Sequence, residues 1–173
     1  MKYYGFTLVE LLITISVIAL LTALALPDFS RQIQKAQTET ATQTLVDAIE
    51  TARSKAVFAN QRTVLRAKKK WHLGWVLFID LNNNGVQDEN ERLLQEHAGL
   101  KNTIIHDSFP VPNEISFIGT GEGRTPGRRD GGAIVMGAMT VCAATADEGI
   151  KLVLNRAGRL RSEKTAAGEC KKT

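Results

Sequence analysis

The side chains with the clearest chemical use lie near the carboxyl end, in the run Gly158-Arg159-Leu160-Arg161. In an extended segment alternate side chains point to the same side, so Arg159 and Arg161 would face one way. Each guanidinium can donate two parallel hydrogen bonds to a phosphate, and two of them can grip adjacent phosphates. Gly158 would let the backbone turn and approach the phosphates closely. The chemistry that this run predicts is anion binding.

The segment around this run is basic. From Lys151 onward, seven basic and two acidic residues give a net charge of +5, more than the +4 of all 173 residues. We therefore expect Lys151, Arg156 and Lys164 to support the two arginines. Two other basic stretches, residues 66–70 and the glycine-rich loop 119–132, are either solvated surface or second anion-binding patches.

A second candidate site is the twelve-residue stretch from Asp80 to Glu91, which fits the spacing of a calcium-binding loop. Oxygen donors stand at loop positions 1, 3, 5, 9 and 12, with glycine at position 6. The flanking residues are typical of strands, whereas an EF-hand needs helices, so a polar hairpin turn reversing at Asn84-Gly85 is the alternative. The candidate ligands are Asp80, Asn82, Asn84, Asp88 and Glu91. Calcium is the only cofactor that the sequence suggests.

No catalytic set of residues stands out, so the sequence predicts a protein that is not an enzyme. The histidines are scattered, at His72, His97 and His106, and no Ser/His/Asp set or carboxylate pair can be argued.

The two cysteines, Cys142 and Cys170, have neither C-x-x-C spacing nor a nearby histidine pair, which argues against a zinc or thioredoxin-like site. Outside the cytosol they would form one disulfide, closing a loop of about 28 residues. Two free buried thiols are the alternative.

The elements that must carry these residues begin with an apolar segment, residues 6–27, in which Glu10 is the only formal charge. As a helix, this segment spans roughly the 30 Å of a bilayer core. No small-residue cleavage site follows it, so we expect a retained membrane anchor. Lys2 favours an orientation with the amino end inside and the rest of the chain outside.

Residues 28–60 are typical of an amphipathic helix that continues the apolar one, with a bend at Pro27. Its expected apolar face consists of Ile33, Ala36, Thr40, Leu45, Ala48, Ile49, Ala52, Ala56 and Val57. Beyond residue 61, β-branched and aromatic runs predict strands near residues 63–66, 74–79, 93–94, 103–105, 115–118, 133–136 and 150–154. The expected fold is α+β, with the long helix packed on antiparallel β-sheets.

The run Gly5-Phe6-Thr7-Leu8-Val9-Glu10-Leu11-Leu12 resembles the processing and methylation site of type IV pilins and type II secretion pseudopilins. The resemblance implies that a prepilin peptidase removes residues 1–5 as a leader, cutting between Gly5 and Phe6, and methylates the new Phe6 amine. It also implies that Glu10 meets the amino terminus of a neighbouring subunit, since two buried opposite charges cost less together than either alone. The alternative for Glu10 is a carboxylate that snorkels to the membrane interface.

Two further stretches, Ala52 to Ala56 (ARSKA) and Gly158 to Arg161 (GRLR), resemble segments of the FimT/GspH branch of minor pilins. In FimT-type minor pilins, a GRxR motif is associated with DNA binding during natural transformation. The resemblance implies a type IV pilin-like fold with a β-rich periplasmic domain over residues 61–173 and a single inner-membrane span. It implies as partners double-stranded DNA, other pilins or pseudopilins and a prepilin peptidase, with assembly into an extracellular pilus.

Two alternatives to a DNA-binding minor pilin remain open. One is a GspH-like pseudopilin or structural minor pilin that assembles a pilus or a type II secretion system without binding DNA. The other is an adhesive tip subunit stabilised by calcium, which depends on the loop at Asp80 alone.

Overall fold

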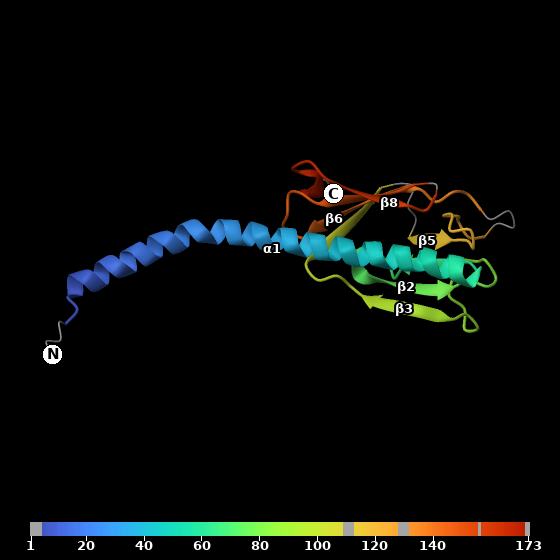
Figure 1. Cartoon of the computed structure of the whole chain (residues 1–173), viewed down its shortest axis with the longest axis horizontal. Helices are drawn as coiled ribbons and strands as arrows, with labels where there is room; N and C mark the ends of the chain where they lie inside the picture. The colour runs from blue at the N-terminus through green and yellow to red at the C-terminus, as the bar shows by residue number, and fades with distance from the viewer. Residues whose placement is uncertain (1–4, 109–112, 128–131, 156, 172–173) are drawn as a thin grey trace.

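The computed structural model describes residues 5–108, 113–127, 132–155 and 157–171, without the side chains of residues 23–28, 107 and 108. One helix, α1 (Leu8–Ala59), runs almost the length of the molecule, and the strands gather around its second half (Figure 1). This arrangement confirms the predicted α+β fold of a long helix packed on antiparallel sheets.

Helix α1 is capped at both ends. At its start, the Thr7 hydroxyl accepts a hydrogen bond from the Glu10 backbone N–H at 3.2 Å, and the Glu10 carboxylate accepts one from the Thr7 N–H at 3.2 Å. This reciprocal capping box satisfies two of the donors that a helix start leaves unpaired. At its end, Asn60 adopts a left-handed conformation, with φ of 49°, that stops the helix.

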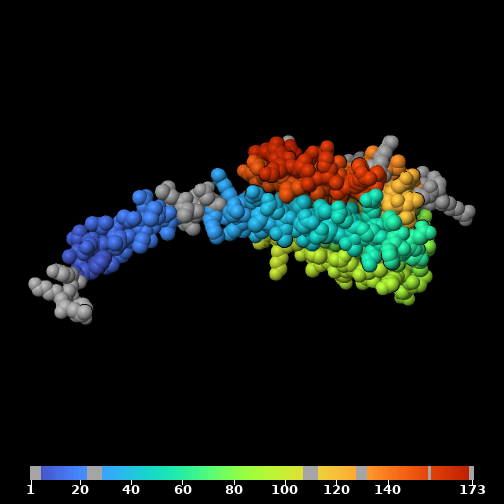
Figure 2. All heavy atoms as spheres, in the orientation of Figure 1, coloured from blue at the N-terminus to red at the C-terminus, as the bar shows by residue number. Residues whose placement is uncertain are grey.

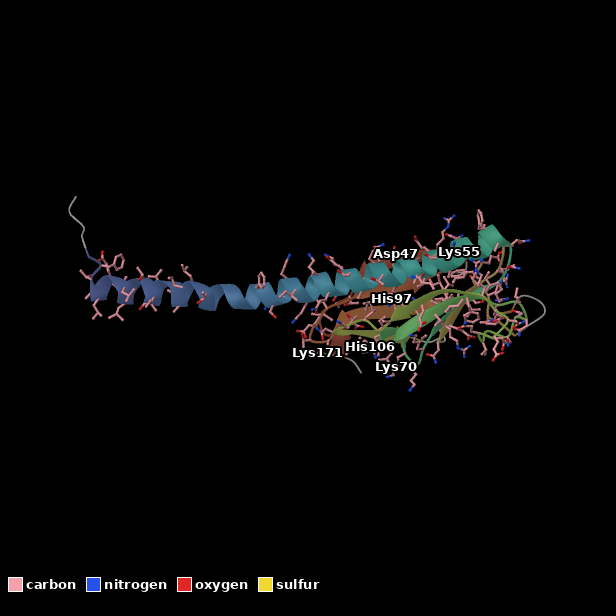
Figure 3. The ribbon with its side chains drawn as sticks, turned by 90° about the horizontal axis from the view of Figure 1, so that it is seen from below. Asp47, Lys55, Lys70, His97, His106 and Lys171 are labelled. Atoms are coloured by element: carbon pink, nitrogen blue, oxygen red, sulfur yellow. A yellow bond between two sulfur atoms is a disulfide. The ribbon has the colours of Figure 1, made fainter. Side chains whose placement is uncertain are left out.

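The first half of α1 projects from the domain without packing on a sheet, and its described side chains point outward on every side (Figures 2 and 3). The large apolar side chains from Phe6 to Leu21 are all at least half exposed. Figure 1 shows that α1 curves gently along this half. Within the described part of the chain, no helix meets the length and hydropathy expected of a membrane span.

The strands form two antiparallel sheets of four strands. The first sheet has the order β3-β2-β1-β5, and the second has the order β4-β6-β7-β8. The first contains β1 (Thr63–Ala67), β2 (Gly74–Ile79), β3 (Leu93–Ala98) and β5 (Glu114–Phe117). The second contains β4 (Thr103–Ser108), β6 (Gly137–Ala143), β7 (Ile150–Leu154) and β8 (Leu160–Lys164). Short 3-10 turns, η1 (Trp71–Leu73) and η2 (Glu169–Lys171), complete the described elements.

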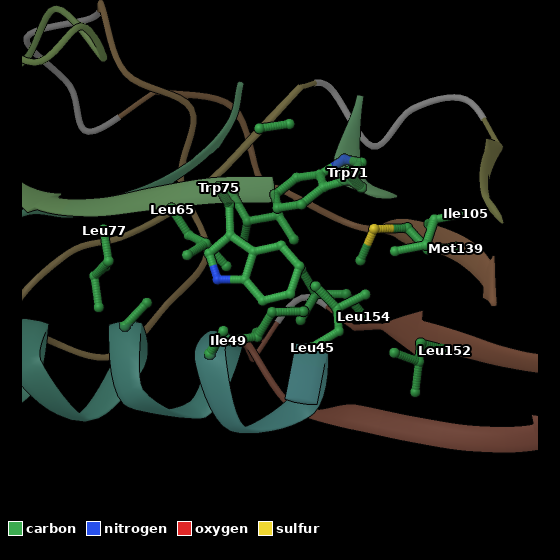
Figure 4. Packing of buried hydrophobic residues seen from close by; sticks show 14 of the residues in the cluster. Leu45, Ile49, Leu65, Trp71, Trp75, Leu77, Ile105, Met139, Leu152 and Leu154 are labelled. Carbon is green, nitrogen blue, oxygen red and sulfur yellow. The ribbon is translucent and has the colours of Figure 1, made fainter. Parts of the chain in front are cut away.

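The core lies where α1 meets both sheets (Figure 4). Leu45 and Ile49 of the helix pack with Trp75 of the first sheet and Leu152 of the second, and all four are almost fully buried. The buried alanines of the helix carry small side chains, which lets the sheets approach it closely. They are Ala41, Ala48, Ala52 and Ala56.

Two details differ from the predictions. The strand predicted at residues 133–136 is wrong: Ile134 makes one isolated bridge with Arg124, and β6 starts at Gly137. Val135 is buried and its N–H donates to Gly123, so this apolar run packs on a loop, and the residues after it pair with β4. The predicted helix face is right from Leu45 to Ala56, but four of its members are exposed. These are Ile33, Ala36, Thr40 and Val57.

The predicted disulfide is confirmed. Cys142 of β6 is bonded to Cys170 of η2, and the Cα–Cα distance is 5.8 Å. The bond ties the end of the described chain to the second sheet, across a sequence separation of 28 residues.

Candidate functional site

The GRLR run lies in the turn that joins β7 to β8 and in the start of β8. Asn155 organises this turn, because its side-chain oxygen accepts hydrogen bonds from the N–H groups of Ala157 and Arg159, each at 3.0 Å. Its backbone N–H donates to the Arg159 carbonyl at 3.0 Å. Gly158 completes the turn with φ of 70°, a conformation that favours glycine. Asn155 thus binds both the N–H and the carbonyl of Arg159, which fixes the backbone of Arg159.

Alternation along β8 sets the direction of the two arginines. Leu160 packs against the core, opposite Leu154 of β7. Arg159 and Arg161, its neighbours on either side, therefore face outward, and both are exposed. Because β8 is an edge strand of its sheet, this surface is open to solvent on its face and along its side.

Lys151 joins the same face. It lies directly opposite Glu163 in the pairing of β7 with β8, and Arg161 lies opposite Val153. The Glu163 carboxylate is 3.1 Å from Nη2 of Arg161 and 4.0 Å from Nζ of Lys151. The outer face of β7 and β8 thus carries Arg159, Arg161 and Lys151, together with one carboxylate.

The other residues expected to support the arginines lie elsewhere. Lys164 belongs to the opposite alternation of β8, paired with Ile150, and lines a cleft of about 520 Å³ between α1 and the second sheet. Arg31 and Lys35 of the helix also line that cleft. Arg156 lies outside the described residues, as do Arg128 and Arg129 of the loop 119–132.

One cationic residue near the turn was not among the predicted site residues. Arg53 of α1 donates from Nε to the carbonyl of Gly121 at 2.9 Å, and the same Nε lies 3.3 Å from the position of a Cβ added to Gly158. The signal was present in the sequence, since Arg53 belongs to the ARSKA stretch. Its proximity to a turn about one hundred residues later follows only from the fold.

The stretch from Asp80 to Glu91 forms the loop between β2 and β3. The buried Asp80 carboxylate accepts hydrogen bonds from the N–H groups of Asn84 at 3.1 Å and Gly85 at 2.9 Å. The Glu91 carboxylate, also buried, accepts from the N–H groups of Leu81 at 2.8 Å and Asp88 at 3.2 Å. These contacts are those of a loop held by its own side chains.

The remaining predicted ligands bond to one another. The side-chain amides of Asn82 and Asn84 donate to the Asp88 carboxylate at 2.6 and 2.9 Å. Over the residues that the structure describes, no group of three or more His, Cys, Asp or Glu side chains is arranged to hold a metal ion. Calcium binding at this loop stays a prediction.

The predicted processing site lies ahead of the helix. Gly5 and Phe6 precede α1 in non-helical backbone and are exposed, with no atom within 4 Å of a Cβ added to Gly5. Glu10 lies one turn into the helix, in the capping box with Thr7.

An exposed apolar helix preceded by an accessible glycine, with two antiparallel sheets on its second half, defines a pilin-like subunit. The chain belongs to the GspH family: the family model described as type II transport protein GspH matches residues 41–158. A second model, the prokaryotic N-terminal methylation motif, matches residues 1–26. No curated protein matches the chain significantly.

Solved structures share the fold. The type IV minor pilin FimU of Pseudomonas aeruginosa aligns with a TM-score of 0.59 and 19% identity, over 78% of this chain and 96% of its own. The minor pseudopilin EpsH from the type 2 secretion system of Vibrio cholerae aligns with a TM-score of 0.52 and 11% identity, over 73% of this chain and 96% of its own. Both a minor pilin and a pseudopilin thus have this architecture.

Proposed function

We propose that this chain is a minor type IV pilin that binds extracellular double-stranded DNA for uptake in natural transformation. The observation that carries the proposal is the outer face of β7 and β8, which carries Arg161 and Lys151 together with Arg159 of the turn that Asn155 braces. Guanidinium and ammonium groups bind phosphate oxygens, and such contacts carry no sequence information. Binding is therefore independent of sequence and weakens as salt rises.

The proposal includes the filament. A prepilin peptidase cuts between Gly5 and Phe6, and the Phe6 amine is then methylated. The apolar half of α1 anchors the subunit in the inner membrane, with the β-rich domain in the periplasm, until it joins other pilins. In the filament, Glu10 leaves its capping box and pairs with the amino terminus of a neighbouring subunit. Display of several weak sites along one filament raises the avidity for a long DNA molecule.

DNA binding is tested with the full chain in a nonionic detergent and a random-sequence duplex, at two salt concentrations. The variant Arg159→Ala/Arg161→Ala is expected to bind at least about tenfold more weakly than the wild type, because it loses two phosphate contacts. The matched control is Lys69→Ala/Lys70→Ala, which removes the same charge from an exposed turn of the other sheet. Equal loss in both variants would mean that only net charge matters, and loss in the control alone would move the site.

A second candidate function is a structural pseudopilin of type II secretion. The observation that favours it is Glu163, which offsets part of the positive charge on the outer face of β7 and β8. This candidate predicts no binding of duplex DNA by the wild type, even at low salt and high protein concentration.

A further inference from the structure

Glu163 lies between two cations of the outer face of β7 and β8, Arg161 and Lys151. Its two oxygens are divided between two cations, with Oε2 3.1 Å from Arg161 Nη2 and Oε1 4.0 Å from Lys151 Nζ. The strand register explains the arrangement: Lys151 is the direct cross-strand partner of Glu163, and Arg161 is its next neighbour on the same face of β8. One carboxylate therefore lies between two cations of different strands.

The Glu163 carboxylate is exposed enough for another anion to replace it at the two cations. The side chains are 42% exposed for Glu163, 43% for Lys151 and 72% for Arg161, so water competes for every contact. Ion pairs at such exposed positions contribute little to stability. A phosphate offers the same kind of anionic oxygens, with more of them and in a geometry that suits a guanidinium.

We propose that Glu163 is a built-in counter-anion of the DNA site, and that binding exchanges its carboxylate for a backbone phosphate at Arg161 and Lys151. This inference rests on the proposed function. While DNA is absent, Glu163 holds the two cations on one face and lowers their net charge from +2 to +1. When a phosphate enters, Glu163 must release them, so the carboxylate reduces the affinity of each single site. Strong binding then requires many subunits on one DNA molecule.

The test is the variant Glu163→Gln, which keeps the shape of the side chain and removes its charge. Duplex affinity of the full chain in detergent is measured over a series of salt concentrations. We expect the variant to bind about threefold to tenfold more tightly at low salt, because one repulsive charge next to the phosphate is gone. The plot of log affinity against log salt steepens by up to about 0.9, the contribution of one further phosphate contact.

The matched control is Glu96→Gln. Glu96 of β3 pairs with Lys68 at 2.7 Å on the other sheet, so this variant makes the same change in net charge and also frees one lysine. Its gain in affinity is expected to be smaller than that of Glu163→Gln at the same salt concentration, since Glu96 lies in the other sheet and pairs with Lys68. A second control, Lys151→Ala/Arg161→Ala/Glu163→Gln, should lose the gain, because the cations that Glu163 holds are missing.

The outcomes separate the two proposals. If the wild type binds through Arg159 and Arg161 but Glu163→Gln binds no better, the counter-anion is overturned and the DNA site stands. Equal gains in Glu163→Gln and Glu96→Gln would overturn it too, in favour of overall charge. If neither the wild type nor Glu163→Gln binds DNA, both proposals fail. Binding by Glu163→Gln alone would overturn both as well, because the exchange requires that the wild type itself binds DNA.

Discussion

Gly158 packs against Gly121 so closely that a Cβ added to Gly158 would lie 2.6 Å from the Gly121 carbonyl oxygen. It would also lie 2.9 Å from Cε1 of Phe117, a fully buried ring at the end of β5. Arg53 of α1 binds the same Gly121 carbonyl. The turn that contains Arg159 therefore packs against α1 and the first sheet, although the two strands that it joins, β7 and β8, belong to the second sheet.

This contact predicts that Gly158→Ala damages the site without removing a charge. The substitution adds a backbone clash to a left-handed conformation that itself costs about 1–2 kcal/mol for a residue with a Cβ. The control is Gly168→Ala, at φ of 85° with no atom within 4 Å of the added Cβ, which pays only the conformational cost. We expect Gly158→Ala to melt well below Gly168→Ala and to bind DNA more weakly. Equal melting temperatures would show that the close contact is unimportant.

The disulfide predicts a strong effect of reduction. Replacing both cysteines in Cys142→Ser/Cys170→Ser opens a loop with a sequence separation of 28 residues and is expected to lower the free energy of unfolding by about 3–4 kcal/mol. Denaturant unfolding measures this loss. A reducing agent should shift the wild type toward the double variant and leave the double variant unchanged. A reduced wild type that unfolds at its original midpoint would contradict the expectation.

The sequence predicted best those helices and strands in which one class of residue recurs regularly along the element. The helix follows from its apolar run and its periodicity, and strands such as β2 follow from their β-branched and aromatic residues. The start and direction of the helix face were harder to predict. Ile33 and Val57 fit the helical period, but both side chains are exposed in the structure.

The candidate site was only partly predictable for a related reason. Strand β8 reads Leu-Arg-Ser-Glu-Lys, with one apolar residue, so it carries no strand pattern of its own and forms by pairing with β7. Its register places Glu163 beside Lys151 and turns Lys164 to the other face. Spacing in the sequence can place Arg159 and Arg161 together, but it cannot show which acidic residue lies across the sheet.

The loop at Asp80 yields a prediction about stability and one about calcium. Asp80→Ala removes the acceptor of the Gly85 N–H and leaves the Asn84 N–H only the Asn82 side-chain oxygen, at 3.0 Å, so it is expected to cost about 1–3 kcal/mol. Asp80→Asn keeps one acceptor oxygen and should cost less.

Thermal unfolding with and without millimolar calcium is expected to coincide for the wild type, because the loop carboxylates already accept hydrogen bonds within the loop. A rise in melting temperature with calcium would instead favour the metal site.

Glu114 predicts how stability depends on pH. Burial raises the pKa of the Glu114 carboxyl above its usual 4.5; the nearby Arg66, whose Nη1 lies 2.8 Å from it, lowers this pKa in part, and the charge of Asp80 raises it further. A carboxyl with a raised pKa binds a proton more tightly in the folded state than in the unfolded one. The stability of the folded state therefore falls as pH rises through the interval between the two pKa values.

The measurement compares the wild type with Glu114→Gln, which keeps an oxygen acceptor for Arg66 and has no charge to lose. Denaturant unfolding from about pH 4 to pH 7 should show the wild type losing stability relative to Glu114→Gln as pH rises. Glu96 supplies the opposite control, because its hydrogen bond and ion pair with Lys68 lower its pKa. The wild type should gain stability relative to Glu96→Gln over the same rise, by a small amount because the pair is exposed. A parallel trend for the two variants would show that burial of Glu114 does not govern its titration.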